Sequence, residues 1–508
     1  MSPAAPRHIE IMDTTLRDGE QTSGVSFSPS EKLTIAQLLL TELNVDRIEI
    51  ASARVSEGEL AAVKAITKWA KANGILNRIE VLTFVDGDVS IKWMQEAGAR
   101  VMNLLTKGSL NHLTHQLKKK PEQHFEEVAA VIALGKKKGL ECNVYLEDWS
   151  NGMRHSRDYV FQYLDFLQHQ PIRRIMLPDT LGVLTPSEVA EYIAAIVQRY
   201  PKLHFDFHAH NDYDLGTANV LEGVKAGAHG IHLTVNGMGE RAGNAPLASA
   251  VAVLNDFLPS VRTNVNEASL YRVSKLVETF SGIRIPANKP VVGENVFTQT
   301  AGIHADGDKK NKLYFSDLMP ERFGRQRKYA LGKTSGKANI ENNLAQLGIQ
   351  LSDPDLKLVT QRIIELGDRK EVVTQADLPY IISDILDSKA IQEKVRIDNY
   401  VLTHSKSLRP SVTVKISING EVFEEHAQGD GQYDAFMNAL KKVYKKQKQE
   451  LPALTDYMVR IPPGGKSDAL CETVITWNAN NREFKTRGLD SDQTVSAIKA
   501  TQKMLNLI

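Results

Sequence analysis

The sequence has little of several features that mark particular protein classes. Only two of its 508 residues are cysteines, and Cys142 and Cys471 show no CxxC or cysteine–histidine spacing. This usage excludes a disulfide scaffold and is typical of a reducing compartment. No apolar run approaches membrane-spanning length, and residues 1–8 contain no apolar signal segment. We therefore expect a cytoplasmic protein without a membrane partner.

An excess of charge of either sign is also missing. The chain has 62 Lys and Arg against 61 Asp and Glu, a formal net charge of +1, which argues against nucleic acid as a partner. The basic run at 441–448 is interpreted as a solvated helix face, because no aromatic interleaving accompanies it. Hydrophobic content of 42% is ordinary for a soluble protein. At 508 residues the chain is too long for one core, so two or three domains are expected.

Short apolar runs alternate with segments of helical periodicity from residue 8 to about 258. The expected strands are 9–12, 47–51, 78–85, 101–105, 143–147, 174–178, 205–210 and 230–235. Clear helical segments are 31–43, 58–72, 122–137, 188–200 and 247–257. Eight such units in roughly 250 residues predict an α/β fold, a (β/α)8 TIM barrel. An open doubly wound sheet is the competing fold, but no GxGxxG follows the first strand.

Polar side chains gather where the expected strands end. They include Arg17-Asp18, Glu147-Asp148, Asp179-Thr180, His208 with His210, and the Gly-rich loop 236–244. In a TIM barrel the carboxyl ends of all strands meet at one rim, which carries the active site. The sequence therefore predicts that these side chains lie around one common site.

The segment His208-Ala-His210 predicts a metal site. Strand side chains alternate between the two faces, so His208 and His210 share a face and both imidazoles can reach one cation. Asp18 offers a carboxylate and Asn244 an amide oxygen. Two histidines with oxygen ligands suit Zn, Mn, Mg or Co, and the choice among these metals stays open. The alternative is a pair of structural histidines.

Such a metal leaves positions free for a substrate. A 2-oxo acid can bind it through a carboxylate oxygen and the keto oxygen, and the metal then polarises the ketone. Arg17 can stabilise the developing alkoxide or hold the carboxylate, and Thr180 can donate to that carboxylate. Glu147 is a candidate for organising the site or transferring a proton, unless it only forms an ion pair with Arg17 or Arg241. His112 is a candidate substrate contact or a surface histidine.

Beyond residue 259 the pattern changes. We expect a catalytic domain at 1–262, helical linker subdomains at 263–394, and a further domain at 395–508. In the last domain, strand-rich 396–427 precedes helix 434–446, and strand-rich 455–487 precedes helix 493–506. This internal duplication predicts an α+β domain built from two βββα units.

The segments LRDGEQ, HAHND and NGMGERAGN carry a resemblance to a known family. Together with AGIHADG in the linker and the duplicated last domain, they resemble the α-isopropylmalate, homocitrate and citramalate synthases along the whole chain. The resemblance implies a Claisen condensation of acetyl-CoA with a 2-oxo acid, followed by hydrolysis of the thioester. It also implies metal ligation by Asp18, His208, His210 and Asn244, and substrate contacts from Arg17, Glu147 and Thr180.

The resemblance further places His304, Asp306 and Tyr314 at the acetyl-CoA side of the site. It also implies that His304 and Tyr314 are catalytic residues, which in this family usually come from the other subunit of a homodimer. The last domain resembles a regulatory domain that binds an amino-acid effector. Glu147, His304 acting through water, and a metal-bound hydroxide remain candidates for the proton-abstracting base.

Within the family, three expected pocket residues point to a small acceptor. Leu82, Leu105 and Tyr145 lie at or beside strand ends, and Tyr145 shares its strand face with Glu147. Isopropylmalate synthases usually have a small serine at the position of Tyr145. Tyrosine with two leucines narrows the pocket, which favours pyruvate and hence the citramalate reaction of isoleucine biosynthesis. The alternative is that all three are ordinary barrel core.

Effector positions are also carried over from the citramalate synthases. The matching residues are Tyr433, Asp434, Leu454, Tyr457, Ile461 and Gln493. Cys471 and Ser491 depart from the family pattern of Val and Pro, which leaves the affinity and the identity of the effector open. Isoleucine is the expected feedback inhibitor.

The main alternative is a 2-isopropylmalate synthase, with 3-methyl-2-oxobutanoate as acceptor and leucine as effector. A homocitrate synthase would need an extra cation for its dicarboxylic acceptor, and a biotin-dependent carboxyltransferase would need a biotinyl Met-Lys-Met segment. A lyase on the same barrel would lack the AGIHADG linker and the duplicated domain. A catalytically dead amino-acid sensor is disfavoured by the intact metal set.

Overall fold

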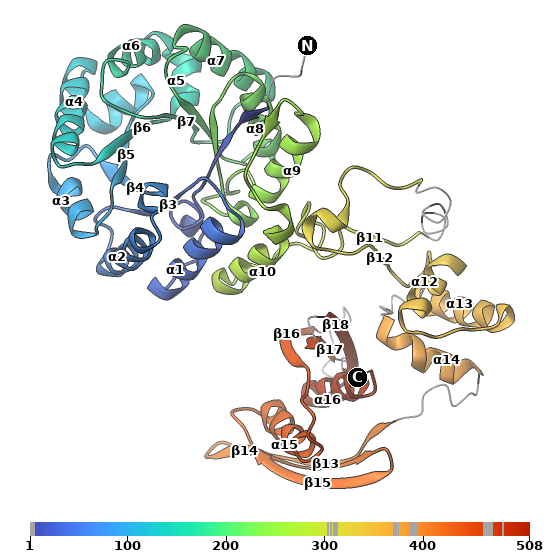
Figure 1. Cartoon of the computed structure of the whole chain (residues 1–508). Helices are drawn as coiled ribbons and strands as arrows, with labels where there is room; N and C mark the ends of the chain where they lie inside the picture. Colours follow the sequence, from blue (N-terminus) through green and yellow to red (C-terminus); the bar gives the residue numbers. More distant parts are fainter. Residues whose placement is uncertain are drawn as a thin grey trace. The chain divides into compact units, whose positions relative to one another are not determined.

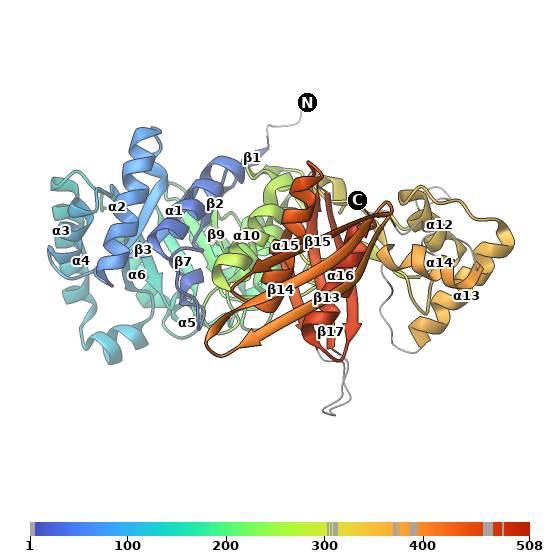
Figure 2. The ribbon, with the colours of Figure 1, turned by 90° about the horizontal axis from the view of Figure 1, so that it is seen from below.

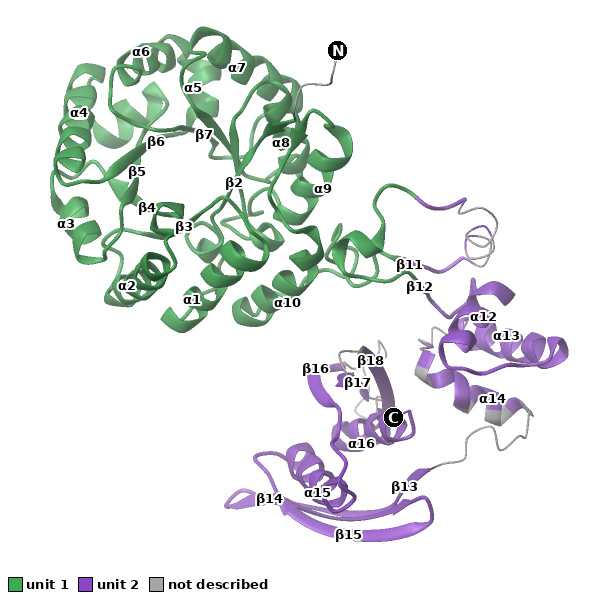
Figure 3. Ribbon diagram, viewed as in Figure 1, with its two compact units in different colours: residues 1–297, 316–327 green, residues 298–315, 328–508 purple. Residues whose placement is uncertain are grey.

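A computed structural model of the chain describes residues 6–301, 304, 307, 313–368, 373, 375–386, 394–460, 471–479 and 482–507. It divides into two compact units, residues 1–297 with 316–327, and residues 298–315 with 328–508 (Figure 3). Within the described residues, no helix combines the length and the apolar character needed to cross a bilayer.

The first unit is built on a closed barrel of eight parallel strands, in chain order, with helices outside the ring (Figure 1). The strands are β2 (Glu10–Asp13), β3 (Arg47–Ser52), β4 (Ile79–Phe84), β5 (Val101–Lys107), β6 (Glu141–Glu147), β7 (Ile175–Asp179), β8 (Phe205–Ala209) and β9 (Gly230–Leu233). β9 pairs with β2 and closes the ring. The predicted TIM barrel and all eight strands are confirmed.

Helices follow the strands around the barrel. They are α1 (Pro29–Gln37), α2 (Glu57–Ala72), α3 (Val89–Glu96), α4 (Pro121–Lys137), α5 (Trp149–His155), α6 (Arg157–Leu167), α7 (Pro186–Arg199), α8 (Gly216–Lys225) and α9 (Leu247–Phe257). Capping boxes start two of them: Ser28 with Glu31 at α1, and Thr185 with Glu188 at α7. In each, the hydroxyl accepts a backbone N–H and the carboxylate accepts another, which satisfies two free donors of the first turn.

Two segments differ from the sequence prediction. The helix expected over 31–43 ends at Gln37, and a π-helical turn, Leu38–Glu42, replaces its last part. All three leucines of this turn, at positions 38–40, are buried. The helix expected in the linker, α10 (Leu270–Ser281), packs into the barrel core through Leu270, Val273 and Val277. The first unit therefore continues past residue 262, where we expected the catalytic domain to end.

Short pairings tie the ends of the first unit together. Strand β1 (Arg7–His8) pairs in parallel with β10 (Val261–Arg262). In the second unit, β11 (Thr298–Gln299) pairs with β12 (Lys328–Tyr329), and three helices follow: α12 (Lys337–Gln346), α13 (Asp353–Asp368) and α14 (Leu378–Leu386). The helical character predicted for this region is confirmed.

The last part of the second unit contains the predicted duplication. One copy is β13 (Val395–Ser405), β14 (Leu408–Ile418), β15 (Glu421–Gln428) and α15 (Gln432–Lys446). The other is β16 (Ala453–Arg460), β17 (Cys471–Ala479), β18 (Arg482–Asp490) and α16 (Gln493–Leu505). Each copy forms a three-stranded antiparallel sheet, and Figure 2 shows the long strands of the first side by side. Residues of both copies, among them Phe436 and Trp477, share one apolar core.

Candidate metal and substrate site in the barrel

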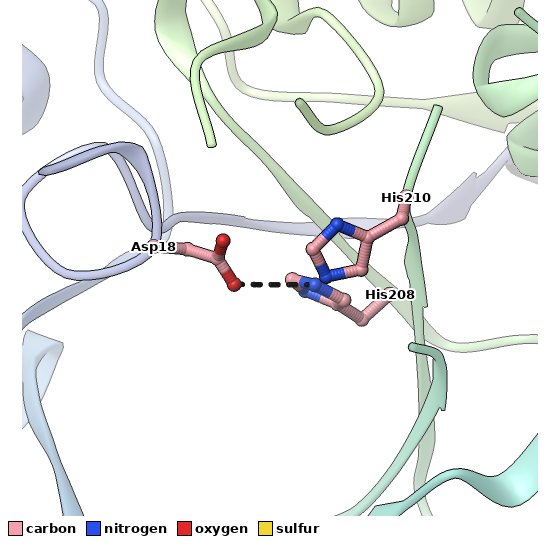
Figure 4. Close-up of side chains that lie close together, drawn as sticks. All are labelled: Asp18, His208 and His210. Carbon is pink, nitrogen blue, oxygen red and sulfur yellow. Dashed lines mark ion pairs between the residues drawn. The ribbon is translucent and has the colours of Figure 1, made fainter. Parts of the chain in front are cut away.

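Three predicted metal ligands meet at the carboxyl-terminal rim of the barrel. Asp18 lies in the loop after β2, His208 lies in β8, and His210 follows directly after β8 (Figure 4). One ligand atom from each lies within 4.8 Å of the others, and Asp18 Oδ2 is 3.4 Å from His208 Nε2. All three side chains are buried. The alternation of strand side chains, which pointed both histidines to one face, explains why they meet.

Asn244 completes this group from the loop after β9. Its Nδ2 donates to Asp18 Oδ1 at 3.0 Å. The backbones of His210 and Asn244 also pair in an isolated antiparallel β-bridge. Asn244 Oδ1 and the Nδ1 atoms of both histidines are buried and lack a hydrogen-bond partner in the structure. Buried acceptors without partners are costly unless something else satisfies them. Two nitrogens, a carboxylate and an amide oxygen are a suitable donor set for a divalent cation.

Charges around these residues favour the protonation states that bind metals. Burial raises the pKa of Asp18, but the neighbouring positive charge, above all that of Arg17, outweighs it and holds the pKa below its usual value. Burial lowers the pKa of His208 well below its ordinary value, against the opposing charge of Asp18. The site thus holds an ionised carboxylate and a neutral imidazole, which are the forms that coordinate metals.

The loop before Asn244 needs glycine close to the site. Gly239 has φ +150°, and a Cβ there would lie 3.3 Å from Asp18 Oδ1 and would also collide with Asn244 Nδ2. The backbone of Gly239 therefore packs directly against two members of the metal group, where no other residue fits.

Arg17 is held by three oxygens beside the metal group. Its Nε donates to Glu49 Oε2 at 2.5 Å, Nη1 to Asp18 Oδ2 at 2.7 Å, and Nη2 to the Tyr145 hydroxyl at 3.3 Å. The side chain is only 10% exposed. Burial lowers the pKa of Arg17, but Glu49 and Asp18 raise it more, so the guanidinium stays charged. A cation fixed in this way can face a bound carboxylate or a developing alkoxide.

Glu49 is a site residue that the sequence analysis missed. It is fully buried on β3, binds Arg17, and accepts a hydrogen bond of 2.7 Å from Asn103 Nδ2. The signal was present in the alternation Arg47-Ile-Glu49, which places two charged residues on one face of a buried strand. Below it, Arg47 contacts Glu80 at 3.0 Å and Asp206 at 2.6 Å, so the barrel interior is polar at depth as well.

The three predicted pocket residues lie together. Leu82 and Tyr145 form an apolar cluster with Met12 and Met176, and Leu105 packs against it. The Tyr145 ring stands edge-on to the His208 ring, with centroids 6.3 Å apart. Its hydroxyl also lies 3.1 Å from His232 Nδ1. This cluster therefore adjoins the metal group.

Glu147 has a different partner from those we considered. Its carboxylate accepts a hydrogen bond from Lys107 Nζ, on the neighbouring strand in direct register. The alternative that Glu147 pairs with Arg17 or Arg241 is therefore wrong. Arg17 pairs with Glu49 and Asp18. Arg241 donates two hydrogen bonds to the Asp212 carboxylate, at 2.7 and 3.0 Å.

Thr180 and His112 both contact Asp148. Thr180 Oγ1 accepts the Asp148 N–H at 2.8 Å, which leaves its own hydroxyl proton available for a substrate. His112 Nε2 lies 3.4 Å from Asp148 Oδ2, and His112 Nδ1 is buried without a hydrogen-bond partner in the structure. Asp148 thus positions two of the predicted substrate contacts.

The predicted acetyl-CoA residues belong to the second unit. The rings of His304 and Tyr314 lie 4.2 Å apart between centroids, so these two side chains form one pair. Asp306 lies outside the described residues.

Most of the predicted effector residues also cluster. Tyr433, Asp434 and Leu454 line a cavity of about 820 Å³ between α15 and β16. The Tyr457 ring lies 5.3 Å from that of Tyr433, and Gln493 hydrogen-bonds to Tyr457. Ile461 lies outside the described residues.

Comparison with known proteins gives matches along nearly the whole chain. Family models match residues 8–277 (HMGL-like), 291–371 (homocitrate synthase post-HMGL domain-like) and 372–508 (LeuA allosteric (dimerisation) domain). The putative (R)-citramalate synthase of Archaeoglobus fulgidus is 34% identical over 98% of this chain and 99% of its own length.

Other relatives carry two different names. The (R)-citramalate synthase of Methanocaldococcus jannaschii is 34% identical over 98% of this chain and 99% of its own. The 2-isopropylmalate synthase of the same organism is 32% identical over 99% and 95%. Among solved structures, the hydroxymethylglutaryl-CoA lyase of Pseudomonas aeruginosa is 17% identical, with a TM-score of 0.45, over 56% of this chain and 95% of its own. The chain therefore belongs to the HMGL-like synthases, the α-isopropylmalate, homocitrate and citramalate synthase family of divalent-metal-dependent acyltransferases that use acetyl-CoA.

Proposed function

We propose that the protein is a citramalate synthase, which condenses acetyl-CoA with pyruvate and hydrolyses the thioester to give citramalate and free CoA. The observation that carries this proposal is the apolar cluster around Tyr145. It lies against His208, where the substituent of a metal-bound 2-oxo acid has to fit. Leu82, Leu105 and the two methionines pack around it, and the methyl group of pyruvate crowds such a packed cluster less than an isopropyl group does.

The size of the acceptor substituent alone can produce a strong preference for pyruvate. Forcing extra methylenes into a packed cluster costs about 1–3 kcal/mol, or roughly 5- to 150-fold in binding. Tyr145 resists displacement, because its hydroxyl is bonded to Arg17 and His232. A branched acceptor substituent has to displace this anchored ring, whereas a methyl group does not.

The residues around the acceptor have distinct roles in this proposal. A metal held by Asp18, His208, His210 and Asn244 polarises the keto group when bound. Arg17 stabilises the negative charge that develops on the keto oxygen as the acetyl carbon attacks. We infer that Glu147, which is paired with Lys107, organises the acceptor or moves a proton, with His304 as the other candidate.

A 2-isopropylmalate synthase is the second candidate. The similarity to relatives of that name, 32% against 34%, favours it nearly as much. The two reactions differ only in the acceptor substituent, methyl or isopropyl, so the residues around that substituent decide between them.

Replacing Tyr145 with alanine is expected to relax the acceptor preference. Removing the ring opens space beside His208 for 2-oxobutanoate and 3-methyl-2-oxobutanoate. We expect the ratio of kcat/KM for pyruvate to that for 3-methyl-2-oxobutanoate to fall at least about tenfold, since the lost discrimination is of the order of 1–3 kcal/mol. Tyr145→Phe separates ring size from anchoring: it keeps the ring but loses the bonds to Arg17 and His232, so the ratio should fall less than in Tyr145→Ala. Equal ratios in Tyr145→Ala and the native protein would remove Tyr145 from the acceptor pocket.

We further propose that the protein is a homodimer in the cytosol and that isoleucine inhibits it by binding in the cavity of the last domain. In this proposal the expected parts 1–262, 263–394 and 395–508 serve catalysis, the acetyl-CoA side and regulation, and the start of the second part packs with the barrel. The match to an allosteric dimerisation domain and the clustering of Tyr433, Leu454 and Tyr457 support this regulation.

Replacing Leu454 with alanine is expected to weaken inhibition by isoleucine. Leu454 is 42% exposed and lines the cavity, so an apolar effector can bury it at little cost to folding. Losing about 1.5–3 kcal/mol of apolar contact raises the half-inhibiting concentration at least about tenfold, with kcat in the absence of isoleucine unchanged. Leu408→Ala, at an exposed leucine outside the cavity, serves as the control in the same steady-state assay. Identical inhibition of both variants would argue against this cavity.

A further inference from the structure

A second, smaller cavity lies beside the metal group in the first unit. It has a volume of about 180 Å³ and is lined by residues 236–239 and 241–243, by Thr22, by residues 283–286 and by Lys289. Three of the lining residues are basic, Arg241, Arg284 and Lys289, and none of the described lining residues is acidic. This composition favours an anionic ligand.

Lys289 is the most informative of these residues. It is half-buried, and its ammonium has no hydrogen-bond or ion-pair partner among the described residues. Burial lowers the pKa of Lys289, and the charge of Asp214 offsets only part of that effect. Arg241, in contrast, is already engaged by Asp212. A desolvated cation without a partner is costly, so an anion arriving at Lys289 gains a strong interaction.

The loop leaves room for this ammonium. Gly237 has φ +70°, and a Cβ there would lie 3.4 Å from Lys289 Nζ and 3.1 Å from Asn244 O. Asn236, at φ 59°, shares the left-handed conformation. The amides of Gly237, Met238, Gly239 and Gly243 already donate to oxygens of the protein, so the contact that this cavity offers an anion comes from the Lys289 side chain. Gly239, which packs against Asp18 and Asn244, lines the same cavity and so separates it from the metal group.

We propose that Lys289, which lines this cavity beside Gly237, binds a phosphate group of the acyl-CoA donor. This inference rests on the proposed function, in which the acceptor is a monocarboxylate held at the metal and the donor alone carries phosphates. The cavity adjoins the metal group and has room for one phosphate with several waters. A charge-assisted contact of this kind contributes to donor affinity and leaves the acceptor untouched.

Replacing Lys289 with alanine tests the proposal in the full-length protein. We expect the KM for acetyl-CoA to rise about tenfold or more, with the KM for the 2-oxo acid unchanged, and Lys289→Arg to restore most of the loss. With S-acetyl-pantetheine, which has no phosphate, Lys289→Ala and the native protein should have equal kcat/KM. Lys92→Ala, at an exposed lysine paired with Asp88, is the matched control.

Several results would overturn the phosphate site. These are an unchanged KM for acetyl-CoA, an equal loss with acetyl-CoA and S-acetyl-pantetheine, or a rise in the KM for the 2-oxo acid instead. Calorimetric titration of CoA separates this failure from that of the proposed function. If no acceptor supports turnover, a Kd for CoA weakened about tenfold in Lys289→Ala still supports the site, and an unchanged Kd rejects it.

Discussion

Replacing His210 with alanine will abolish tight metal binding and lower kcat at least about a thousandfold, while the barrel stays folded. The side chain is 8% exposed, and its Nδ1 has no hydrogen-bond partner in the structure, so its removal takes a ligand away without breaking a hydrogen bond of that atom. Lewis-acid polarisation of the ketone is worth several kcal/mol, and each 1.36 kcal/mol is a factor of ten in rate. Asp18→Ala should behave alike and should also release Arg17.

The control for this prediction lies on the same strand segment. His204 stands at the opposite end of the barrel, where its Nε2 is 2.9 Å from Asp206 Oδ1. His204→Ala should retain metal and most activity, at a stability cost of about 1 kcal/mol. Metal content by elemental analysis, circular dichroism and kcat distinguish the variants. Full activity of His210→Ala in metal-depleted buffer would contradict the Lewis-acid role.

Replacing Arg17 with lysine is expected to lower kcat about a hundredfold or more, although the positive charge is kept. Arginine reaches Glu49, Asp18 and Tyr145 from three different nitrogens, whereas lysine has a single nitrogen at the end of a flexible chain. The ammonium can face one of these oxygens but cannot hold all three, so the charge no longer points to the site where the alkoxide forms.

Glu49→Gln tests whether the fixed orientation of Arg17 matters, because Glu49 holds the Arg17 side chain in place. Glu49 is buried beneath Arg17. Losing its charge should therefore lower kcat in the same direction and also destabilise the fold, because breaking a buried ion pair costs about 3–5 kcal/mol. Steady-state kinetics with thermal unfolding separate the two effects. Near-native kcat in Arg17→Lys would show that Arg17 needs charge alone and not its fixed orientation.

Much of the barrel could be predicted, because parallel strands buried on both faces leave short apolar runs between amphipathic helices. The strand predicted at 101–105 extends in the structure to Lys107. Thr106 and Lys107 are polar, and nothing in the sequence shows that Lys107 lies opposite Glu147 on the neighbouring strand. The end of α1 at Gln37 was also missed, because a π-helical turn keeps the periodicity of a helix over the first residues.

The metal group could be predicted from local spacing, since His208 and His210 share a strand face and the barrel brings Asp18 to the same rim. The partners of Arg17 could not, because Glu49 lies 32 residues away on another strand, and the alternation around it does not show which cation it binds. The link between Asp148, Thr180 and His112 depends likewise on loops that only the closed barrel brings together.

The most direct test is the release of free CoA from acetyl-CoA by the native protein, with Mn²⁺ or Zn²⁺ present. The acceptors are pyruvate, 2-oxobutanoate, 3-methyl-2-oxobutanoate and 2-oxoglutarate. We predict that pyruvate is preferred about a hundredfold in kcat/KM, which corresponds to about 2.7 kcal/mol in transition-state binding. A preference for 3-methyl-2-oxobutanoate would contradict the proposal and identify a 2-isopropylmalate synthase whose cluster around Tyr145 opens to admit a branched acceptor.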